Sequence, residues 1–341
     1  MAEPVSAYEV RTADYHTGGE PFRIVLGGGP ELPGATVLDR REWVLEHADE
    51  VRRLLINEPR GHADMYGCYV VPPDDDGAVL GTVFFHKDGY STACGHGTIA
   101  LATWAVEDGR VAAPADGETE LAIDVPSGRV AARVRTAGGR VQSVAFRNVP
   151  AYVTGRQLEV STSAGVVRAD VSYGGAFYAS VRAADLGLRV TAEDLPRLIE
   201  LGREVKWALN SSGAAQHPGD PRLSGVYGTI WWEDGDSADP AVVRQRNVTV
   251  FADGEVDRSP CGSGTSARLA LLADRGVLTG DRHLLHESIV GSSFVGRVVE
   301  DVEVHGRAAV VTEVEGRAHR TGTHTFVLDP DDALGLGFQL R

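Results

Sequence analysis

Two cysteine–glycine segments of the sequence carry residue types suited to acid–base chemistry. Residues 91–100 read STACGHGTIA, and residues 259–268 read SPCGSGTSAR. Aligned from the cysteine, residues 94–109 and 261–276 share Cys, two Gly, Thr, Ala and a closing Gly without a gap. Such glycines are typical of a strand-to-helix junction and of the residue that follows a helix. The repeat predicts two similar domains that face one another.

A cysteine just before a helix is suited to proton transfer. The helix N-terminus presents unpaired N–H groups and partial positive charge, which bind a carboxylate and favour thiolate over thiol. A helix end contributes at most about 2 kcal/mol, which would lower a cysteine pKa from about 8.5 to about 7. With a substrate α-carbon between two such sulfurs, one would remove the α-proton and the other would protonate the opposite face. This is stereoinversion, and it needs no metal, flavin or pyridoxal phosphate.

Three other kinds of site compete with this interpretation. A zinc site from Cys94, His96 and His86 lacks a second ligand pair. A cysteine hydrolase using Cys94 leaves the second cysteine segment unexplained. A phosphate-binding loop is excluded because neither segment has the lysine of a Walker motif. A non-catalytic amino-acid-binding protein also stays open, and it would exchange no α-hydrogen with solvent.

The two lysines and the third cysteine are expected to have ordinary structural roles. Lys87 and Lys206 are the only lysines, which disfavours a Schiff-base cofactor. We expect Lys206 to be a surface lysine of a helix. Cys68 lies in the apolar stretch MYGCYVV and is expected in the core.

The composition is that of a globular protein without a nucleic-acid or membrane partner. The chain has 341 residues and a net charge of −15, whereas binding to nucleic acid or anionic lipid needs a basic surface. No apolar run is long enough to span a bilayer, and the first 20 residues show no secretory signal. We expect a cytoplasmic enzyme.

Hydrophobic periodicity predicts many strands and a few helices. Residues 38–57 are expected to form one surface helix and 192–209 another, while 81–86 reads as a buried strand. Residues 119–183 alternate in short β-branched runs between turns. The expected fold class is α+β.

The chain resembles the proline racemase family, which includes proline racemases, 4-hydroxyproline 2-epimerases and trans-3-hydroxy-L-proline dehydratases. The similar segments are DYHTGGEPFRI (14–24), EPRGHADMYG (58–67), GYSTACGHGTIA (89–100), DRSPCGSGTSAR (257–268) and GRAHRTGTHTF (316–326). The resemblance implies two pseudo-symmetric domains, each a mixed sheet curled around a central helix, as in diaminopimelate epimerases, with the active site in the cleft between them. The implied domains are residues 1–155 with about 318–341, carrying Cys94, and residues 156–317, carrying Cys261.

The same resemblance implies roles for individual residues. The acid/base pair would be Cys94 and Cys261. The substrate carboxylate would bind at Gly95, His96, Gly262 and Ser263. Asp257 would receive the ring ammonium, since a buried ammonium needs a counter-charge. Tyr66 and Phe251 would be aromatic walls around the ring.

Within the family, the residue at position 261 guides the choice of reaction. Dehydratases usually carry threonine there, so Cys261 favours two-base inversion. The first expectation is a proline racemase without cofactor or metal, acting on a small-molecule substrate. The alternatives are a trans-3-hydroxy-L-proline dehydratase and a 4-hydroxyproline 2-epimerase, and a homodimer stays open.

Overall fold

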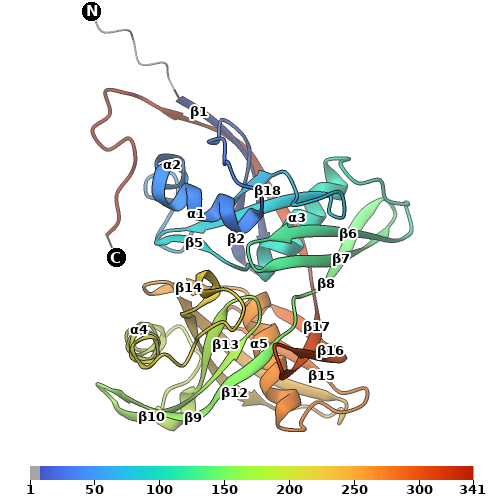
Figure 1. Ribbon diagram of the computed structural model, residues 1–341, viewed down its shortest axis with the longest axis vertical. Coiled ribbons are helices and arrows are strands. Elements are labelled where there is room, and N and C mark those ends of the chain that lie inside the picture. The colour runs from blue at the N-terminus through green and yellow to red at the C-terminus, as the bar shows by residue number, and fades with distance from the viewer. Residues whose placement is uncertain (1–7, 341) are drawn as a thin grey trace, which may run out of the picture.

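The computed structural model describes residues 8–340, which form two halves with equivalent connections (Figure 1). The strands of the first half are β1 (Tyr8–Thr17), β2 (Glu20–Gly27), β3 (Tyr66–Val71), β4 (Leu80–His86), β5 (Gly89–Ser91), β6 (Gly117–Val125), β7 (Gly128–Ala137), β8 (Arg140–Arg147) and β18 (Ala318–Leu328). The strands of the second half are β9 (Tyr152–Thr162), β10 (Gly165–Tyr173), β11 (Phe177–Arg182), β12 (Val226–Gly235), β13 (Val242–Phe251), β14 (Glu255–Asp257), β15 (His283–Ser288), β16 (Ser293–Val304) and β17 (Arg307–Gly316). The helices are α1 (Val37–His47), α2 (Glu50–Ile56), α3 (Gly95–Glu107), α4 (Leu195–Ser212) and α5 (Gly262–Asp274), with short 3-10 turns at Ala183–Leu186 and Pro221–Leu223.

Strand pairing is the same in the two halves. The first half runs β18–β1–β2–β3–β4–β6–β7–β8, with β2–β3 and β4–β6 parallel and the other pairs antiparallel. The second half runs β9–β10–β11–β12–β13–β15–β16–β17, with β11–β12 and β13–β15 parallel. In each half a short strand, β5 or β14, pairs with the C-terminal end of the fifth strand, β4 or β13, just before the central helix. The predicted α+β class and the pseudo-symmetry are therefore confirmed.

Each mixed sheet curls around one helix. Helix α3 packs against β1, β2 and β18 from one end of its sheet and against β7 and β8 from the other. The equivalent strands β9, β10, β11, β16 and β17 pack against α5. The first eleven residues of each helix, from Gly95 and from Gly262, are buried. A helix enclosed on all sides is mainly apolar or small, as both sequences are apart from His96 in α3 and Arg268 in α5.

The halves are joined by strand pairing as well as by the chain. The final strand β18 returns to pair with β1, as Figure 1 shows for the red strand beside the blue one. Residues 313–316 of β17 pair with 144–147 of β8. The expected domain limits, 1–155 with about 318–341 and 156–317, stay a prediction, and residues 1–7 and 341 lie outside the described residues.

The prediction of one continuous helix over residues 38–57 is wrong, because the segment forms two helices. Thr36 caps α1, accepting a hydrogen bond from the Asp39 N–H. At Ala48 the backbone leaves the helical region (φ −147°, ψ 61°). The chain then starts α2, in which the adjacent side chains of Leu54 and Leu55 are both buried.

Lys206 is not the surface lysine that the sequence suggested. It is 9% exposed, and its ammonium donates to the Ala252 carbonyl oxygen in the turn between β13 and β14. The neighbouring Trp207 is 52% exposed instead. A lysine stem is long enough to bury its methylenes and still reach a backbone acceptor.

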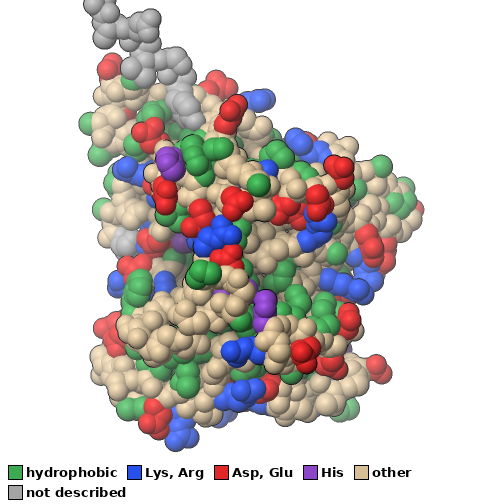
Figure 2. Space-filling model, in the orientation of Figure 1, with side chains coloured by type: hydrophobic (Ala, Val, Ile, Leu, Met, Phe, Trp, Pro, Cys, Tyr) green, Lys and Arg blue, Asp and Glu red, His purple; other side chains and the backbone are tan. Residues whose placement is uncertain are grey.

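The described surface carries charges of both signs. On the face in Figure 2, Asp and Glu side chains lie among Lys and Arg side chains. Within residues 8–340, no helix is both long enough and apolar enough to cross a membrane.

Candidate active site

The N-termini of the two central helices meet at two glycines. A Cβ added to Gly95 would lie 2.4 Å from the Gly262 Cα, so the two backbones are in direct contact. Cys94 and Cys261 immediately precede these glycines. The two cysteine motifs, distant in sequence, therefore form one site between the halves.

A small buried cavity of about 10 Å³ lies at this contact. It is lined by Tyr66, Ala93, Cys94, Gly95, His96, Tyr178, Tyr227, Phe251, Asp257, Cys261 and Ser263. Eight of the nine site residues expected from the sequence are in this lining, and the ninth, Gly262, touches Gly95. At this size the cavity has room for about one water molecule, so a larger ligand can enter only when the lining moves apart.

Cys94 has the backbone of a helix N-cap, as its sequence context predicted. Its Sγ accepts a hydrogen bond from the Gly97 N–H at 3.3 Å. Both ring nitrogens of His96 lie 3.5 Å from the same sulfur. Burial lowers the pKa of His96 to about 3, so the imidazole next to Cys94 is neutral at pH 7.

Cys261 has a different backbone and different neighbours. Its φ of 64° and ψ of 102° lie in the left-handed region, which a side chain rarely adopts. Its sulfur makes no N-cap bond but lies 3.8 Å from the Tyr178 hydroxyl. Strained residues of this kind persist where the surrounding structure holds them, and they cluster at functional sites.

The expected lowering of the cysteine pKa is wrong for the closed cavity. Burial raises the pKa of both Cys94 and Cys261 well above the ordinary thiol value, and the nearby Asp257 carboxylate adds to the effect. The Gly97 and Gly264 N–H groups act in the opposite direction, as a helix end should. The cost of placing a thiolate between the two halves, away from solvent, exceeds the stabilisation that these N–H donors give it.

Asp257 supplies negative charge to the cavity. Its Oδ1 accepts hydrogen bonds from the Ser259 N–H and hydroxyl at 2.8 and 2.7 Å, and its Oδ2 lies 3.8 Å from His96 Nδ1. Burial raises the pKa of Asp257 to about 6. At pH 7 the carboxylate is ionised between two neutral thiols, which favours a cationic group on the ligand.

One wall of the cavity combines aromatic rings with hydroxyl groups. The rings of Tyr66 and Phe251, both buried, lie 5.8 Å apart. The Tyr66 hydroxyl lies 2.5 Å from Ser91 Oγ and 3.1 Å from the Tyr227 hydroxyl. These three neutral hydroxyls can exchange donor and acceptor roles, so the wall can bind a ring hydroxyl as well as an apolar ring face.

Sequence reasoning missed Tyr178 and Tyr227. Neither lies in a cysteine motif, and both occur in strands that read as ordinary core. A signal for Tyr178 exists, because residues 17–22 (TGGEPF) align without a gap to 173–178 (YGGAFY). We find no comparable signal for Tyr227.

The arrangement expected for the zinc alternative is not formed. His86 packs its ring against that of Tyr66, and its Nδ1 lies 3.3 Å from Glu255 Oε1. In the part of the chain that the structure describes, no group of three or more His, Cys, Asp or Glu side chains is arranged to hold a metal ion.

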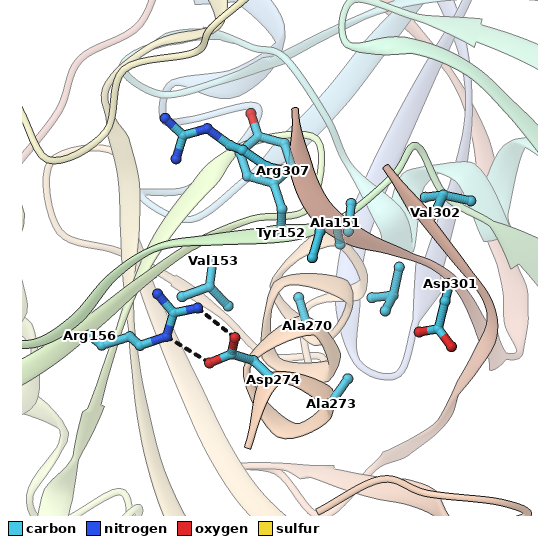
Figure 3. A pocket seen from close by; sticks show the side chains of 13 residues that line it. Ala151, Tyr152, Val153, Arg156, Ala270, Ala273, Asp274, Asp301, Val302 and Arg307 are labelled. Carbon is cyan, nitrogen blue, oxygen red and sulfur yellow. Dashed lines mark hydrogen bonds and ion pairs between the residues drawn. The ribbon is translucent and has the colours of Figure 1, made fainter. Parts of the chain in front are cut away.

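A larger cavity, of about 540 Å³, lies near the opposite end of α5 (Figure 3). Alanine and valine side chains form much of its lining, and Arg156 and Asp274 are ion-paired on one side at 2.5 Å. It holds neither cysteine. Size alone therefore does not identify the active site, whereas the smaller cavity concentrates the groups that can transfer protons.

Comparisons with known proteins agree with this site. The family model described as proline racemase matches residues 12–339. A Burkholderia multivorans protein named 3-hydroxyproline 2-epimerase is 47% identical over 97% of this chain and 98% of its own. A Burkholderia cenocepacia protein named trans-3-hydroxy-L-proline dehydratase is 46% identical over the same shares.

Solved structures show the same architecture. A hydroxyproline epimerase from Agrobacterium vitis, crystallised with bound trans-4-hydroxy-L-proline, superposes with a TM-score of 0.91 at 32% identity, covering 98% of this chain and 95% of its own. A PhzF-family phenazine biosynthesis protein from Bacillus anthracis has a TM-score of 0.57 at 12% identity, covering 93% and 98%, a likeness of fold alone. The family match over residues 12–339 and the 47% identical relative show that the chain belongs to the proline racemase family.

Proposed function

We propose that the protein is a cofactor-independent 2-epimerase of 3-hydroxyproline in which Cys94 and Cys261 are the acid/base pair. The observation that carries the proposal is that both sulfurs line one buried cavity at the N-termini of two facing helices. We place 3-hydroxyproline ahead of proline, the substrate expected first from the sequence, because the 47% identical relative carries that name.

The cavity offers a complementary partner for each charged group of the substrate. The carboxylate would bind the N–H groups at the first turns of α3 and α5, starting at Gly95 and Gly262, where helix ends favour an anion. The secondary ammonium would pair with Asp257, the ionised carboxylate of the lining. Between these two anchors the α-carbon would lie with one sulfur on each face.

Proton transfer would then proceed in two steps that balance without a co-reactant. One cysteine, as thiolate, takes the proton from Cα, and the resulting charge spreads into the carboxylate as an ene-diolate. The other cysteine, as thiol, gives its proton to the opposite face. The helix N-termini stabilise the developing charge, and the ammonium offsets the burial that disfavours the thiolate.

The hydroxyl wall supports a hydroxylated ring. Ser91, Tyr66 and Tyr227 form a buried set of neutral hydroxyls at the side of the cavity. A ring hydroxyl of the substrate would join this set by hydrogen bonding. Proline would leave the set without that partner.

Dehydration of trans-3-hydroxy-L-proline is the second candidate, and the name of the 46% identical relative favours it. It would begin with the same removal of the α-proton. The 3-hydroxyl would then leave as water, and the enamine formed would tautomerise to a cyclic imine. This route needs only one sulfur at Cα, whereas inversion needs both Cys94 and Cys261.

The test is incubation of the protein in D₂O with trans-3-hydroxy-L-proline, trans-4-hydroxy-L-proline and L-proline in separate reactions, followed by NMR. We expect loss of the Cα proton signal of the 3-hydroxy compound together with build-up of its 2-epimer. A cyclic imine without the epimer would overturn epimerisation in favour of dehydration. Absence of both α-exchange and imine formation with all three compounds would overturn both candidates.

A further inference from the structure

The two cysteines have unequal polar surroundings. Cys94 receives a backbone hydrogen bond from Gly97 and has an imidazole at 3.5 Å. Cys261 instead has a phenol hydroxyl at 3.8 Å, that of Tyr178. This hydroxyl also lies 2.7 Å from Ser263 Oγ.

The difference comes from one position of the internal repeat. Strands β2 and β11 are equivalent, and in the gapless alignment of 17–22 with 173–178 Phe22 corresponds to Tyr178. Phe22 packs against the first turn of α3, with its ring 5.6 Å from that of His96. Tyr178 faces the first turn of α5 in the same way, so the second half carries a hydroxyl at a place where the first half carries only a ring.

We propose that Tyr178 is a positioning residue for Cys261, accepting a hydrogen bond from its thiol and donating one to its thiolate, with Ser263 completing the chain. Tyr178 is fully buried, so the orientation of its hydroxyl is set by these protein partners. The part that Cys261 then plays in turnover rests on the proposed function.

The hydrogen bonds that link Cys261, Tyr178 and Ser263 can point in either of two directions. With Cys261 protonated, S–H donates to the Tyr178 oxygen and the phenol O–H donates to Ser263. With Cys261 ionised, Ser263 donates to the phenol oxygen and the phenol O–H donates to sulfur. No proton leaves Tyr178 in either setting, because burial raises the pKa of its phenol well above the ordinary value.

The titratable groups around Cys261 other than Tyr178 do not supply this donor. Asp257, from β14, is a carboxylate and opposes the thiolate. Cys94, from the N-terminus of α3, also disfavours a second negative charge. His96 lies beside Cys94 and Asp257. The Tyr178 hydroxyl, together with the Thr249 hydroxyl and the Gly264 N–H, acts in the opposite direction and lowers the pKa of Cys261 against its burial.

The experiment measures the reactivity of Cys261 directly. In a C94S background, iodoacetamide alkylation of the peptide containing Cys261 is followed by mass spectrometry across pH, with and without Y178F. We expect Y178F to lower the alkylation rate at a fixed pH below the midpoint by about tenfold, the effect of losing one hydrogen bond to a charged acceptor. Y227F is the matched control, since it removes another hydroxyl of the cavity that bonds Tyr66 rather than a sulfur.

A second background separates a specific effect from a loosened cavity. In C261S protein, Y178F should leave the alkylation rate of Cys94 unchanged. An equal change at both cysteines, or none at Cys261, would overturn the proposal. Should Y178F fail to fold, 3-fluorotyrosine at position 178 keeps the ring and strengthens the donor, and it should instead speed alkylation of Cys261; an unchanged rate would count against the proposal. These readouts need no substrate, so a failed proposed function leaves them interpretable.

Discussion

Gly95 and Gly262 contact each other backbone to backbone at the centre of the protein. A Cβ on Gly95 would lie 2.4 Å from the Gly262 Cα, and a Cβ on Gly262 would lie 2.6 Å from the Gly95 Cα. Each glycine directly follows one of the two cysteines. The contact therefore fixes how far apart the two sulfurs lie.

Gly95→Ala and Gly262→Ala should each separate the helix N-termini. Because backbone cannot yield as a flexible side chain does, we expect a loss of about 1–3 kcal/mol in the free energy of unfolding, typical of overpacking. Activity should fall by about a hundredfold, since a displacement of about 1 Å has that effect on a proton-transfer geometry. Denaturant titration and rate measurement check this. Gly27→Ala is the control, because its nearest neighbour is the end of the Arg11 side chain.

Cys94→Ser and Cys261→Ser should each abolish inversion while leaving the fold intact. Removing a general acid or base lowers the rate by about 10²–10⁴-fold. The measurement is the rate of appearance of the 2-epimer, with the thermal midpoint as a check on folding. Cys261→Thr separates the two candidate reactions: a dehydratase should keep its activity, whereas an epimerase should lose inversion. Inversion that persists in either serine variant would refute the two-base mechanism.

The pH dependence of kcat/KM should be bell-shaped, with ionisation of Asp257 near 6 and of one thiol at higher pH together forming the acid limb. Burial raises the pKa of Asp257 to about 6, and only the ionised carboxylate can pair with the substrate ammonium, so the rate should rise as pH increases through that value. The alkaline limb should follow ionisation of the second thiol, whose pKa burial also raises. Limbs of this kind belong to the interacting groups together. Initial rates between pH 5 and 10 test this, and a flat profile from 5 to 7 would contradict the role of Asp257.

Asp257→Asn should inactivate the protein and stabilise it. The pKa of Asp257 is raised from 3.8 in the unfolded chain to about 6 in the folded protein. Protonated Asp257 therefore stabilises the fold. This contribution is fully present below pH 3.8 and is lost as the pH rises through about 6. Asparagine keeps the neutral form at every pH. We expect the variant to exceed wild type by up to about 3 kcal/mol at pH 7–8, with the difference shrinking toward pH 4. Chemical denaturation at several pH values measures this, and a variant less stable than wild type at pH 8 would contradict it.

Tyr66→Phe should change substrate preference more than overall activity. It removes the hydroxyl that links Ser91 and Tyr227, and a lost hydrogen bond to a ring hydroxyl should lower kcat/KM for 3-hydroxyproline about tenfold. Any turnover of proline should be unaffected. Tyr90→Phe is a suitable control, because that hydroxyl bonds Asp49 outside the cavity. An equal loss on both substrates would indicate a structural effect only.

Local patterns in the sequence predicted the parts of the site that local structure determines. The glycines after Cys94 and Cys261 and the glycines that close α3 and α5 are requirements of helix ends, so the repeat located both helices. The alternating strands gave the fold class for the same reason. The first expectation for the substrate, proline, is not confirmed, because differences among ring substrates depend on side chains outside these motifs.

Features that depend on packing between distant segments were not predictable. The pKa of Cys94 was expected to fall because a helix end acts within its first turn, but burial by both halves raises it. Lys206 was expected in solvent because its helix was placed without the turn that supplies the Ala252 carbonyl. Tyr227 enters the cavity only through the position of β12, which no motif marks.

The return of β18 to β1 also determines the order in which the chain can fold. Strands β9–β17 of the second half are continuous in sequence. In the first half, β1 pairs on one side with β18, which is the last strand of the chain. On the ribosome the second half can therefore complete its sheet first, because domains fold as units once all their strands have been synthesised. The first half stays open beside it until residues 318–328 emerge. The cavity, which needs both halves, then forms only at the end of synthesis, so a nascent chain would carry both cysteines without the enclosed site that pairs them.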